Sequence, residues 1–195
     1  RQRQMCIRDS FSVLENICLG HSRLSIIDLS SASNQPFEDY ESKLSMVYNG
    51  CIYNYIDLRN KLIKKGHVFK TSGDTEVVLK SYLEWGEECV KFFEGDFAIA
   101  IWDNNRKRLF LFRDRFGIKP LYFTNARNFF RFGSTLQSII VKNDIDLALD
   151  EKSLHMHFSL HAVVPAPDTL FKNIKKVPPG CYLTIDENKK ISIIQ

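Results

Sequence analysis

The sequence predicts an α+β domain in which antiparallel strands outnumber helices. Residues 97–102 and 109–113 alternate on either side of Asp103-Asn104-Asn105, a pattern typical of a long hairpin with one buried face. Helical periodicity recurs in separate segments elsewhere in the chain. The chain has 195 residues, 44% of them apolar, which is enough for one sizeable core, so we expect a single domain.

The other elements follow in chain order. Residues 55–65 are expected to form the first helix, because Tyr55, Leu58 and Leu62 share one helical face and Gly66 follows as a stop. The second helix is expected to begin at Asp74, in the position of an N-cap. Further strands are predicted at 17–19, 44–48, 121–124, 129–133, 181–185 and 191–194, and further helices at 134–141 and 151–160.

Asn49 and Gly50 place a side-chain amide beside an unhindered backbone N–H at the end of an expected strand. Such a pair suits an oxyanion hole, in which donors point at the negative charge that develops on a carbonyl oxygen during acyl transfer. An Asn-Gly pair between β-rich segments is also the commonest short hairpin turn. Both interpretations are open at this point.

Arg23 and Asp74 are further candidates, because their charges are complementary to those of a free amino acid. A guanidinium matches the substrate carboxylate, and a carboxylate matches the ammonium group. Each residue also has a structural alternative. Arg23 is able to pair with Asp28, and Asp74 is able to cap its helix, a role that can coexist with ligand binding.

Six blocks occur in order along the chain: GHSRLSIIDLS, NQPF, NGCIYNY, SGDTEVVL, GDFAIAIWD and RDRFGIKPLY. Together they resemble the glutaminase domain of the glutamine-hydrolysing asparagine synthetases, over most of the chain. The resemblance implies a class II glutamine amidotransferase with the N-terminal-nucleophile hydrolase fold, a four-layer αββα sandwich of two antiparallel sheets. In this family an N-terminal Cys attacks the side-chain amide of glutamine, and the released ammonia amidates aspartate on a second, ATP-using domain.

The resemblance also implies roles for individual residues. Asn49 and Gly50 are implied as the oxyanion hole, and Asp74 as the ligand of the α-amino group of glutamine. Cys51 departs from the family pattern, which has Glu there, so we expect weaker glutamine binding and no new nucleophile. The full set of implied substrate-binding residues is Arg23, Leu24, Ser25, Ile26, Ile27, Asn49, Gly50, Cys51 and Asp74.

The nucleophile is where the sequence departs most from the family. Family members begin Met-Cys-Gly-Ile and run several dozen residues before the block that contains His21, whereas Cys6 is close to it here. A Cys inside a chain has a peptide nitrogen, which cannot act as the general base. We therefore expect residues 1–10 to be a non-native tail, residues 11–195 to be a partial, N-terminally truncated amidotransferase domain, and the fragment to be inactive because its nucleophile is missing.

No cofactor and no metal are expected on this chain. A Ser-Gly-Gly-x-Asp-Ser loop for ATP does not occur in the sequence, so ATP and Mg are expected on a C-terminal synthetase domain of the same polypeptide. His157 and His161 would share a helix face, but even with His155 nearby they lack a third ligand on it. The charged stretch 113–120 is interpreted as a structural loop.

Composition restricts the class of partner. The net charge of +4 comes from scattered Lys and Arg, so a nucleic-acid-binding module is the least favoured hypothesis. Five widely spaced cysteines argue against a disulfide framework and favour the cytoplasm. No apolar stretch approaches the roughly twenty residues of a membrane span. The alternative to an enzyme is a non-catalytic glutamine-binding or assembly module, and a homodimer stays open for either.

Overall fold

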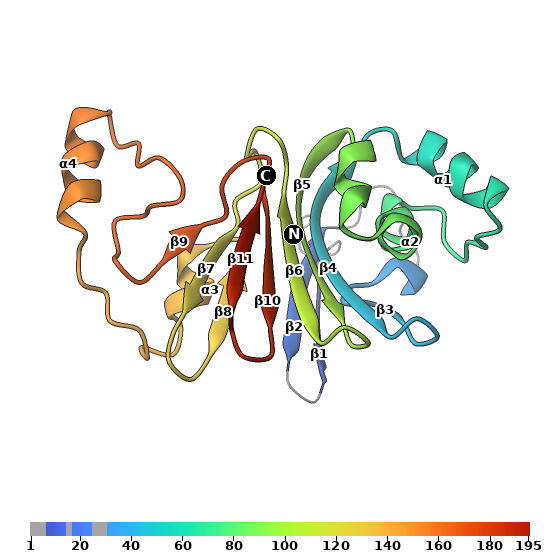
Figure 1. Cartoon of the computed structure of the whole chain (residues 1–195), viewed down its shortest axis with the longest axis horizontal. Coiled ribbons are helices and arrows are strands. Elements are labelled where there is room, and N and C mark those ends of the chain that lie inside the picture. Colours follow the sequence, from blue (N-terminus) through green and yellow to red (C-terminus); the bar gives the residue numbers. More distant parts are fainter. Residues whose placement is uncertain (1–6, 15–16, 25–30) are drawn as a thin grey trace.

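A six-stranded antiparallel sheet forms the centre of the fold (Figure 1). The structure is a computed structural model and describes residues 7–14, 17–24 and 31–195. Strands β4 and β5 pair along their whole length, from Leu44 opposite Asp103 to Ile52 opposite Gly95. In spatial order the strands are β11 (Ile191–Ile194), β10 (Tyr182–Asp186), β6 (Arg108–Arg113), β5 (Gly95–Asp103), β4 (Leu44–Ile52) and β3 (Phe37–Asp39).

Two smaller antiparallel sheets pack against one face of the central sheet. Leu19 from the first and Phe123 from the second share an apolar core with Val47 and Leu111 of the central sheet. This shared core fixes the sheets face to face, as in other layered sandwiches. The first sheet is the hairpin of β1 (Ile7–Val13) and β2 (Cys18–Leu24), and the second has the order β8 (Phe130–Gly133), β7 (Tyr122–Asn125), β9 (Lys175–Lys176).

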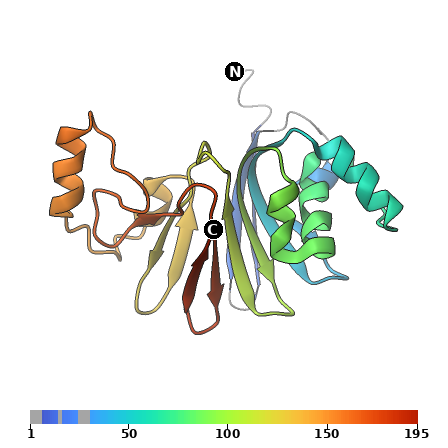
Figure 2. The same cartoon turned by 45° about the horizontal axis from the view of Figure 1, so that its top comes forward.

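Helices α1 (Tyr55–Lys64) and α2 (Asp74–Trp85) cover the opposite face of the central sheet (Figures 1 and 2). The 3-10 helix η3 (Gly86–Phe92) follows α2 directly. Side chains of alternate strand residues point into this helical core, as the two-residue period of a strand requires. The core includes Met46 and Tyr48 of β4, Phe110 and Phe112 of β6, Leu58 and Leu62 of α1, and Val77 and Val78 of α2.

A last layer of helix lies on the far side of the three-stranded sheet. Phe130 and Phe132 of β8 pack toward the sheet-to-sheet core. Gly133, the next residue along the strand, faces the other side, where a Cβ atom on it would lie 2.1 Å from Ser138 Oγ of α3 (Leu136–Ile140). The layers are therefore helix, sheet, sheet, helix, and the expected αββα sandwich is confirmed. The remaining helices are η2 (Ser31–Ser33) and α4 (Glu151–Ser159).

Most predicted elements are confirmed, with shifted ends. The hairpin around residues 103–105 is β5 and β6, and the two main helices begin at Tyr55 and Asp74 as predicted. The strand predicted at 17–19 continues to Leu24, and the one predicted at 44–48 continues to Ile52. Strands β1, β3 and β9 have no counterpart in the prediction. Residues 7–10 of the expected tail lie in β1, and the division of the chain at residue 10 stays a prediction.

Candidate functional site

Asn49 and Gly50 lie inside β4, where the strand pairs with β5. A Cβ atom on Gly50 would lie 2.1 Å from the Asp96 carbonyl oxygen, and one on Gly95 would lie 2.1 Å from the Cys51 carbonyl oxygen. The two glycines therefore let β4 and β5 approach closely on both sides of the pair formed by Cys51 and Asp96. The interpretation of Asn49-Gly50 as a hairpin turn is wrong, because the strand continues through it.

The backbone N–H of Gly50 points away from β5. Tyr53, just beyond the strand end, donates its N–H to the Glu94 carbonyl oxygen at 2.7 Å, in the same register as the β4–β5 pairing. Successive N–H groups of a strand point to opposite edges, so odd-numbered donors of β4 face β5 and even-numbered donors face the other edge. Gly50 N–H belongs to the second set.

Two side chains bind this outer edge of β4, one on each side of Gly50. Tyr48 donates its N–H to Oε1 of Gln35 at 2.5 Å. Ile52 donates its N–H to Oδ2 of Asp74 at 3.1 Å. The Gly50 N–H thus lies between a carboxamide and a carboxylate that are fixed on the strand two residues before it and two residues after it.

The side chain of Asn49 faces a cavity. It points away from the helical core, because its neighbour Tyr48 points into that core. The cavity has a volume of about 1140 Å³ and is lined by β2, β4, β5, β8 and the start of α3. Asn49 donates from Nδ2 to Ser134 Oγ at 3.4 Å across it. Adjacent residues therefore offer an amide donor in a cavity and a backbone donor at a strand edge, which fits an oxyanion hole.

Asp74 is buried, with 6% of its surface exposed, and is the first residue of α2. Its Oδ2 accepts a hydrogen bond from the Tyr48 hydroxyl at 2.7 Å as well as the one from Ile52. The N-cap is Gly73, so the prediction that Asp74 caps the helix is wrong. Burial, and next the charge of Asp74, raise the pKa of Tyr48, so the phenol stays a hydrogen-bond donor.

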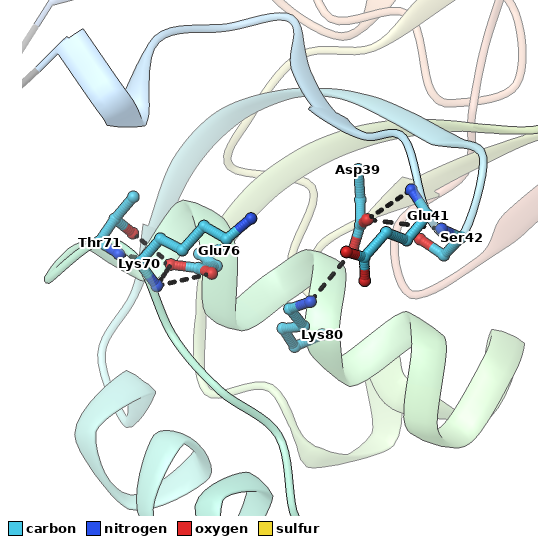
Figure 3. Close-up of polar contacts among 7 residues, drawn as sticks. All are labelled: Asp39, Glu41, Ser42, Lys70, Thr71, Glu76 and Lys80. Atoms are coloured by element: carbon cyan, nitrogen blue, oxygen red, sulfur yellow. Dashed lines mark hydrogen bonds and ion pairs between the residues drawn. The ribbon is translucent and has the colours of Figure 1, made fainter.

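The loop before Asp74 is held by a second buried carboxylate (Figure 3). Glu76, 2% exposed, accepts the N–H groups of Lys70 and Thr71 and the Thr71 hydroxyl, at distances from 2.7 to 3.0 Å. Arg59 donates to the Thr71 and Gly73 carbonyl oxygens at 2.8 and 2.9 Å. Both N–H and C=O groups of the loop therefore have charged partners, which fixes the backbone that leads into Asp74.

Figure 3 also shows how α2 is tied to the edge of the central sheet. Lys80 Nζ lies 3.0 Å from Asp39 Oδ2 at the end of β3, and both side chains are mostly buried. Burial acts to raise the pKa of Asp39, but the hydrogen bond and charge of Lys80 outweigh it and hold that pKa below its ordinary value. The pair therefore anchors the middle of the helix that carries Asp74 at its start.

Cys51 follows the two candidate donors on β4. Burial, and then the charges of Asp74 and Asp96, raise the pKa of its thiol. A protonated thiol is a poor nucleophile, because the reactive form is the thiolate. This supports the interpretation that Cys51 does not replace the family's nucleophile.

The charged stretch 113–120 is a structural loop, as predicted. Arg113 donates to the carbonyl oxygens of Lys119, Val177 and Gly117 at 2.9, 2.7 and 2.7 Å. Asp114 is 1% exposed, and among the described residues its carboxylate accepts from backbone N–H groups of its own loop and of β5. The charges of Arg113 and Asp114 are therefore used to close a turn, which is a structural role.

The structure brings Asn49, Gly50, Cys51 and Asp74 together on one segment of β4 and the adjoining helix start. The backbones of Arg23 and Leu24 lie in β2, opposite Arg8 and Ile7. The expected pocket residues Ser25, Ile26 and Ile27, and the doubtful nucleophile Cys6, lie outside the described residues.

Sequence reasoning missed Gln35 and Tyr48 as parts of the site. Gln35 stood within the NQPF block, but a buried carboxamide that binds a strand edge has no periodic signal in sequence. Within the described ranges, no three His, Cys, Asp or Glu side chains gather where a metal ion could be held. None of the helices in these ranges is long and apolar enough to cross a membrane.

Comparison with known proteins gives matches over most of the chain. Residues 8–193 match the family described as glutamine amidotransferase domain. The chain is 37% identical to asparagine synthetase [glutamine-hydrolyzing] 3 of Bacillus subtilis (strain 168) over 174 residues, which are 89% of this chain and 28% of that protein. It is 40% identical to asparagine synthetase [glutamine-hydrolyzing] 1 of the same organism, over 88% of this chain and 27% of that protein.

Solved structures show the same fold at lower identity. An allosteric regulatory enzyme of purine biosynthesis superposes with a TM-score of 0.66 at 17% identity, covering 91% of this chain and 34% of that one. The glutamine phosphoribosylpyrophosphate amidotransferase of B. subtilis gives a TM-score of 0.61, also at 17% identity and with the same coverage of each chain. The chain thus spans between 27% and 34% of the length of these relatives.

Proposed function

This chain belongs to the glutamine amidotransferase domain family, and from that premise we propose that it binds glutamine and stabilises the oxyanion formed when its side-chain amide is hydrolysed. The observation that carries the proposal is the outer edge of β4. There Gly50 N–H lies between two fixed side chains, and the Asn49 amide faces a cavity beside it. A preorganised pair of donors of this kind favours the transition state over the substrate.

In the proposed reaction a cysteine thiolate adds to the side-chain carbonyl carbon of glutamine. The electron pair of the C=O double bond moves to the oxygen, which Asn49 Nδ2 and Gly50 N–H stabilise. The C–N bond then breaks, ammonia leaves with the proton that the general base took from the thiol, and a thioester remains. Water hydrolyses the thioester to glutamate and restores the thiol.

The two charged ends of glutamine need complementary groups. We assign the substrate ammonium to Asp74, whose described bonds both use Oδ2 and leave acceptor capacity on a carboxylate that can accept about four. We assign the substrate carboxylate to Arg23, with Leu24, Ser25, Ile26 and Ile27 as neighbours in the pocket. The thiolate belongs to an N-terminal cysteine, since the described cysteines Cys18, Cys51, Cys89 and Cys181 all have peptide nitrogens.

The ammonia released by glutamine hydrolysis has a proposed use in a second reaction. Relatives that the chain matches over about nine-tenths of its length are named as glutamine-hydrolysing asparagine synthetases. We therefore propose that the ammonia serves the ATP-dependent amidation of aspartate, with ATP and Mg bound by a synthetase region of the same polypeptide. A cytoplasmic location fits the free thiols of the described cysteines.

The proposal is tested on the protein expressed from its own start codon, as read from the source DNA. Glutamate and ammonia release are measured with glutamine as substrate, and glutamine binding is measured by calorimetry on the same sample. We expect both hydrolysis and binding. Binding without glutamate release would overturn the catalytic proposal in favour of a glutamine-binding module, and absence of binding would overturn the assignment of the site.

A further inference from the structure

Gln35 makes an unusual contact for a side chain just outside a strand. Its Oε1 accepts the N–H of Tyr48 at 2.5 Å, and its Nε2 donates to the carbonyl oxygen of Tyr48 at 2.9 Å. One carboxamide therefore binds both backbone groups of a single residue, as a neighbouring strand does. Gln35 is 4% exposed, so these bonds form away from bulk water.

The position of Gln35 continues the register of the sheet. Phe37 of β3 lies opposite Met46 of β4, and Asp39 lies opposite Leu44. Extending this register by two residues places Gln35 opposite Tyr48. Beyond the end of β3, the Gln35 side chain thus makes the hydrogen bonds to β4 that a strand backbone would otherwise make. The residue it binds, Tyr48, is the last one before the Asn49-Gly50 pair.

Tyr48 links this contact to the other side of the site. Its backbone is held by Gln35, and its hydroxyl donates to Asp74 Oδ2 at 2.7 Å. Asp74 in turn holds the N–H of Ile52 at 3.1 Å. The segment that contains Gly50 is therefore fixed at both ends by side chains that are coupled through one tyrosine.

We propose that Gln35 is a positioning residue for the oxyanion donors, holding the outer edge of β4 so that the Gly50 N–H and the Asn49 amide keep their direction. This inference rests on the proposed function. Oxyanion donors act only within about 2.7–3.1 Å of the oxygen, and a misplacement of about 1 Å can cost a hundredfold in rate. Loss of Gln35 therefore lowers kcat more than it raises KM, because the donors are needed most in the transition state.

The experiment replaces Gln35 in the protein expressed from its own start codon. Gln35→Met keeps the length of the side chain and removes both hydrogen bonds, and Gln35→Glu keeps an acceptor for the Tyr48 N–H but loses the donor. The matched control is Thr169→Val, because Thr169 is also buried at 3% exposure and binds backbone groups, donating to the Ile174 carbonyl oxygen at 2.7 Å, far along the chain from β4.

We expect Gln35→Met to lower kcat about tenfold to a hundredfold with KM within about threefold of the parent, and Thr169→Val to leave both unchanged. Amide hydrogen exchange at Gly50 should be faster in Gln35→Met and in Gln35→Glu but not in the control. Parental kcat and parental Gly50 exchange in a folded Gln35 variant would overturn the inference. A parent without glutaminase activity would instead overturn the proposed function, and Gly50 exchange would still decide whether Gln35 positions the strand.

Discussion

Two buried carboxylates, Asp114 and Asp74, are used in different ways. Asp114 accepts four backbone N–H groups, from Phe97, Phe116, Ile118 and Lys119, at 2.9 to 3.3 Å and with both of its oxygens. The described bonds of Asp74 number two and both use Oδ2. Each carboxylate is at most 6% exposed, so burial alone does not distinguish them.

The difference lies in the partners. A carboxylate can accept about four hydrogen bonds, and Asp114 fills that number with backbone donors of its own loop and of β5. Among the described residues, Asp74 binds a tyrosine hydroxyl and one N–H at the strand edge that also carries Gly50, and we propose that its remaining accepting capacity serves a ligand ammonium group. Counting donors around a buried charge thus separates a carboxylate that closes a loop from one suited to a substrate.

Replacing Asn49 should give the largest effect on activity. Asn49→Ala removes one of the two proposed oxyanion donors, so kcat for glutamine hydrolysis should fall about a hundredfold to a thousandfold while the melting temperature changes little. The control is Asn173→Ala, which removes an exposed amide that donates to the Asp146 carbonyl oxygen at 2.9 Å. Steady-state kinetics of both variants provide the check, and equal kcat values would exclude Asn49 from the oxyanion hole.

Replacing Asp114 should affect stability instead. Asp114→Ala leaves one buried and three partly buried backbone N–H groups without this acceptor, so the free energy of unfolding should drop by about 3 kcal/mol. Urea denaturation measures the loss. Any variant that stays folded should keep the parental KM for glutamine, and a raised KM at full stability would contradict the structural role of this loop.

The assignment of Asp74 to the substrate ammonium predicts a loss of affinity. Asp74→Asn keeps an oxygen that can accept from Tyr48 and Ile52, but it removes the negative charge, so the Kd for glutamine should rise about tenfold. Calorimetry measures the change. The matched control is Asp114→Asn, which makes the same isosteric change at the structural carboxylate and should leave the Kd unchanged.

The smallest effect is expected at the ion pair that anchors α2. Lys80→Met should lower the free energy of unfolding by about 0.5–1 kcal/mol at pH 7, where Asp39 is ionised. The pKa of Asp39 is lowered in the folded protein, so the pair stabilises the fold above the unfolded pKa of about 4 and loses this effect as pH falls through the folded value. Urea denaturation of parent and variant over a series of pH values below 7 checks this, and a difference that does not shrink as the pH falls would show that Lys80 acts through packing.

The elements that were predictable carry local signals. The helix at Tyr55, the helix at Asp74 and the hairpin around 103–105 follow from periodicity and turn residues, and the loop at 113–120 follows from its paired charges. The Asn49-Gly50 pair was ambiguous, because a turn and a close approach of two strands both select glycine. The close approach of β4 and β5 also depends on Gly95, which is distant from Gly50 in sequence and which the sequence pattern predicts only as the start of a strand.

The coupling of Gln35, Tyr48 and Asp74 was not predictable for a similar reason. Each residue lies in a different element, and only the register of β3 on β4 and the packing of α2 bring them together. The capping prediction for Asp74 failed because Gly73 takes the N-cap position and the carboxylate binds the strand edge instead. Residue type indicated the chemistry of the site, and tertiary contacts set its geometry.

The most direct measurement is a titration of the ¹⁵N-labelled protein with glutamine, followed by NMR at the backbone amides of β4 and of the 113–120 loop. If the outer edge of β4 holds the substrate amide, the Gly50 N–H and the Asn49 side-chain amide should shift in a saturable way, while Gly117 and Ile118 stay fixed. Saturable shifts that leave Gly50 and Asn49 unchanged and occur elsewhere would contradict the placement of the site.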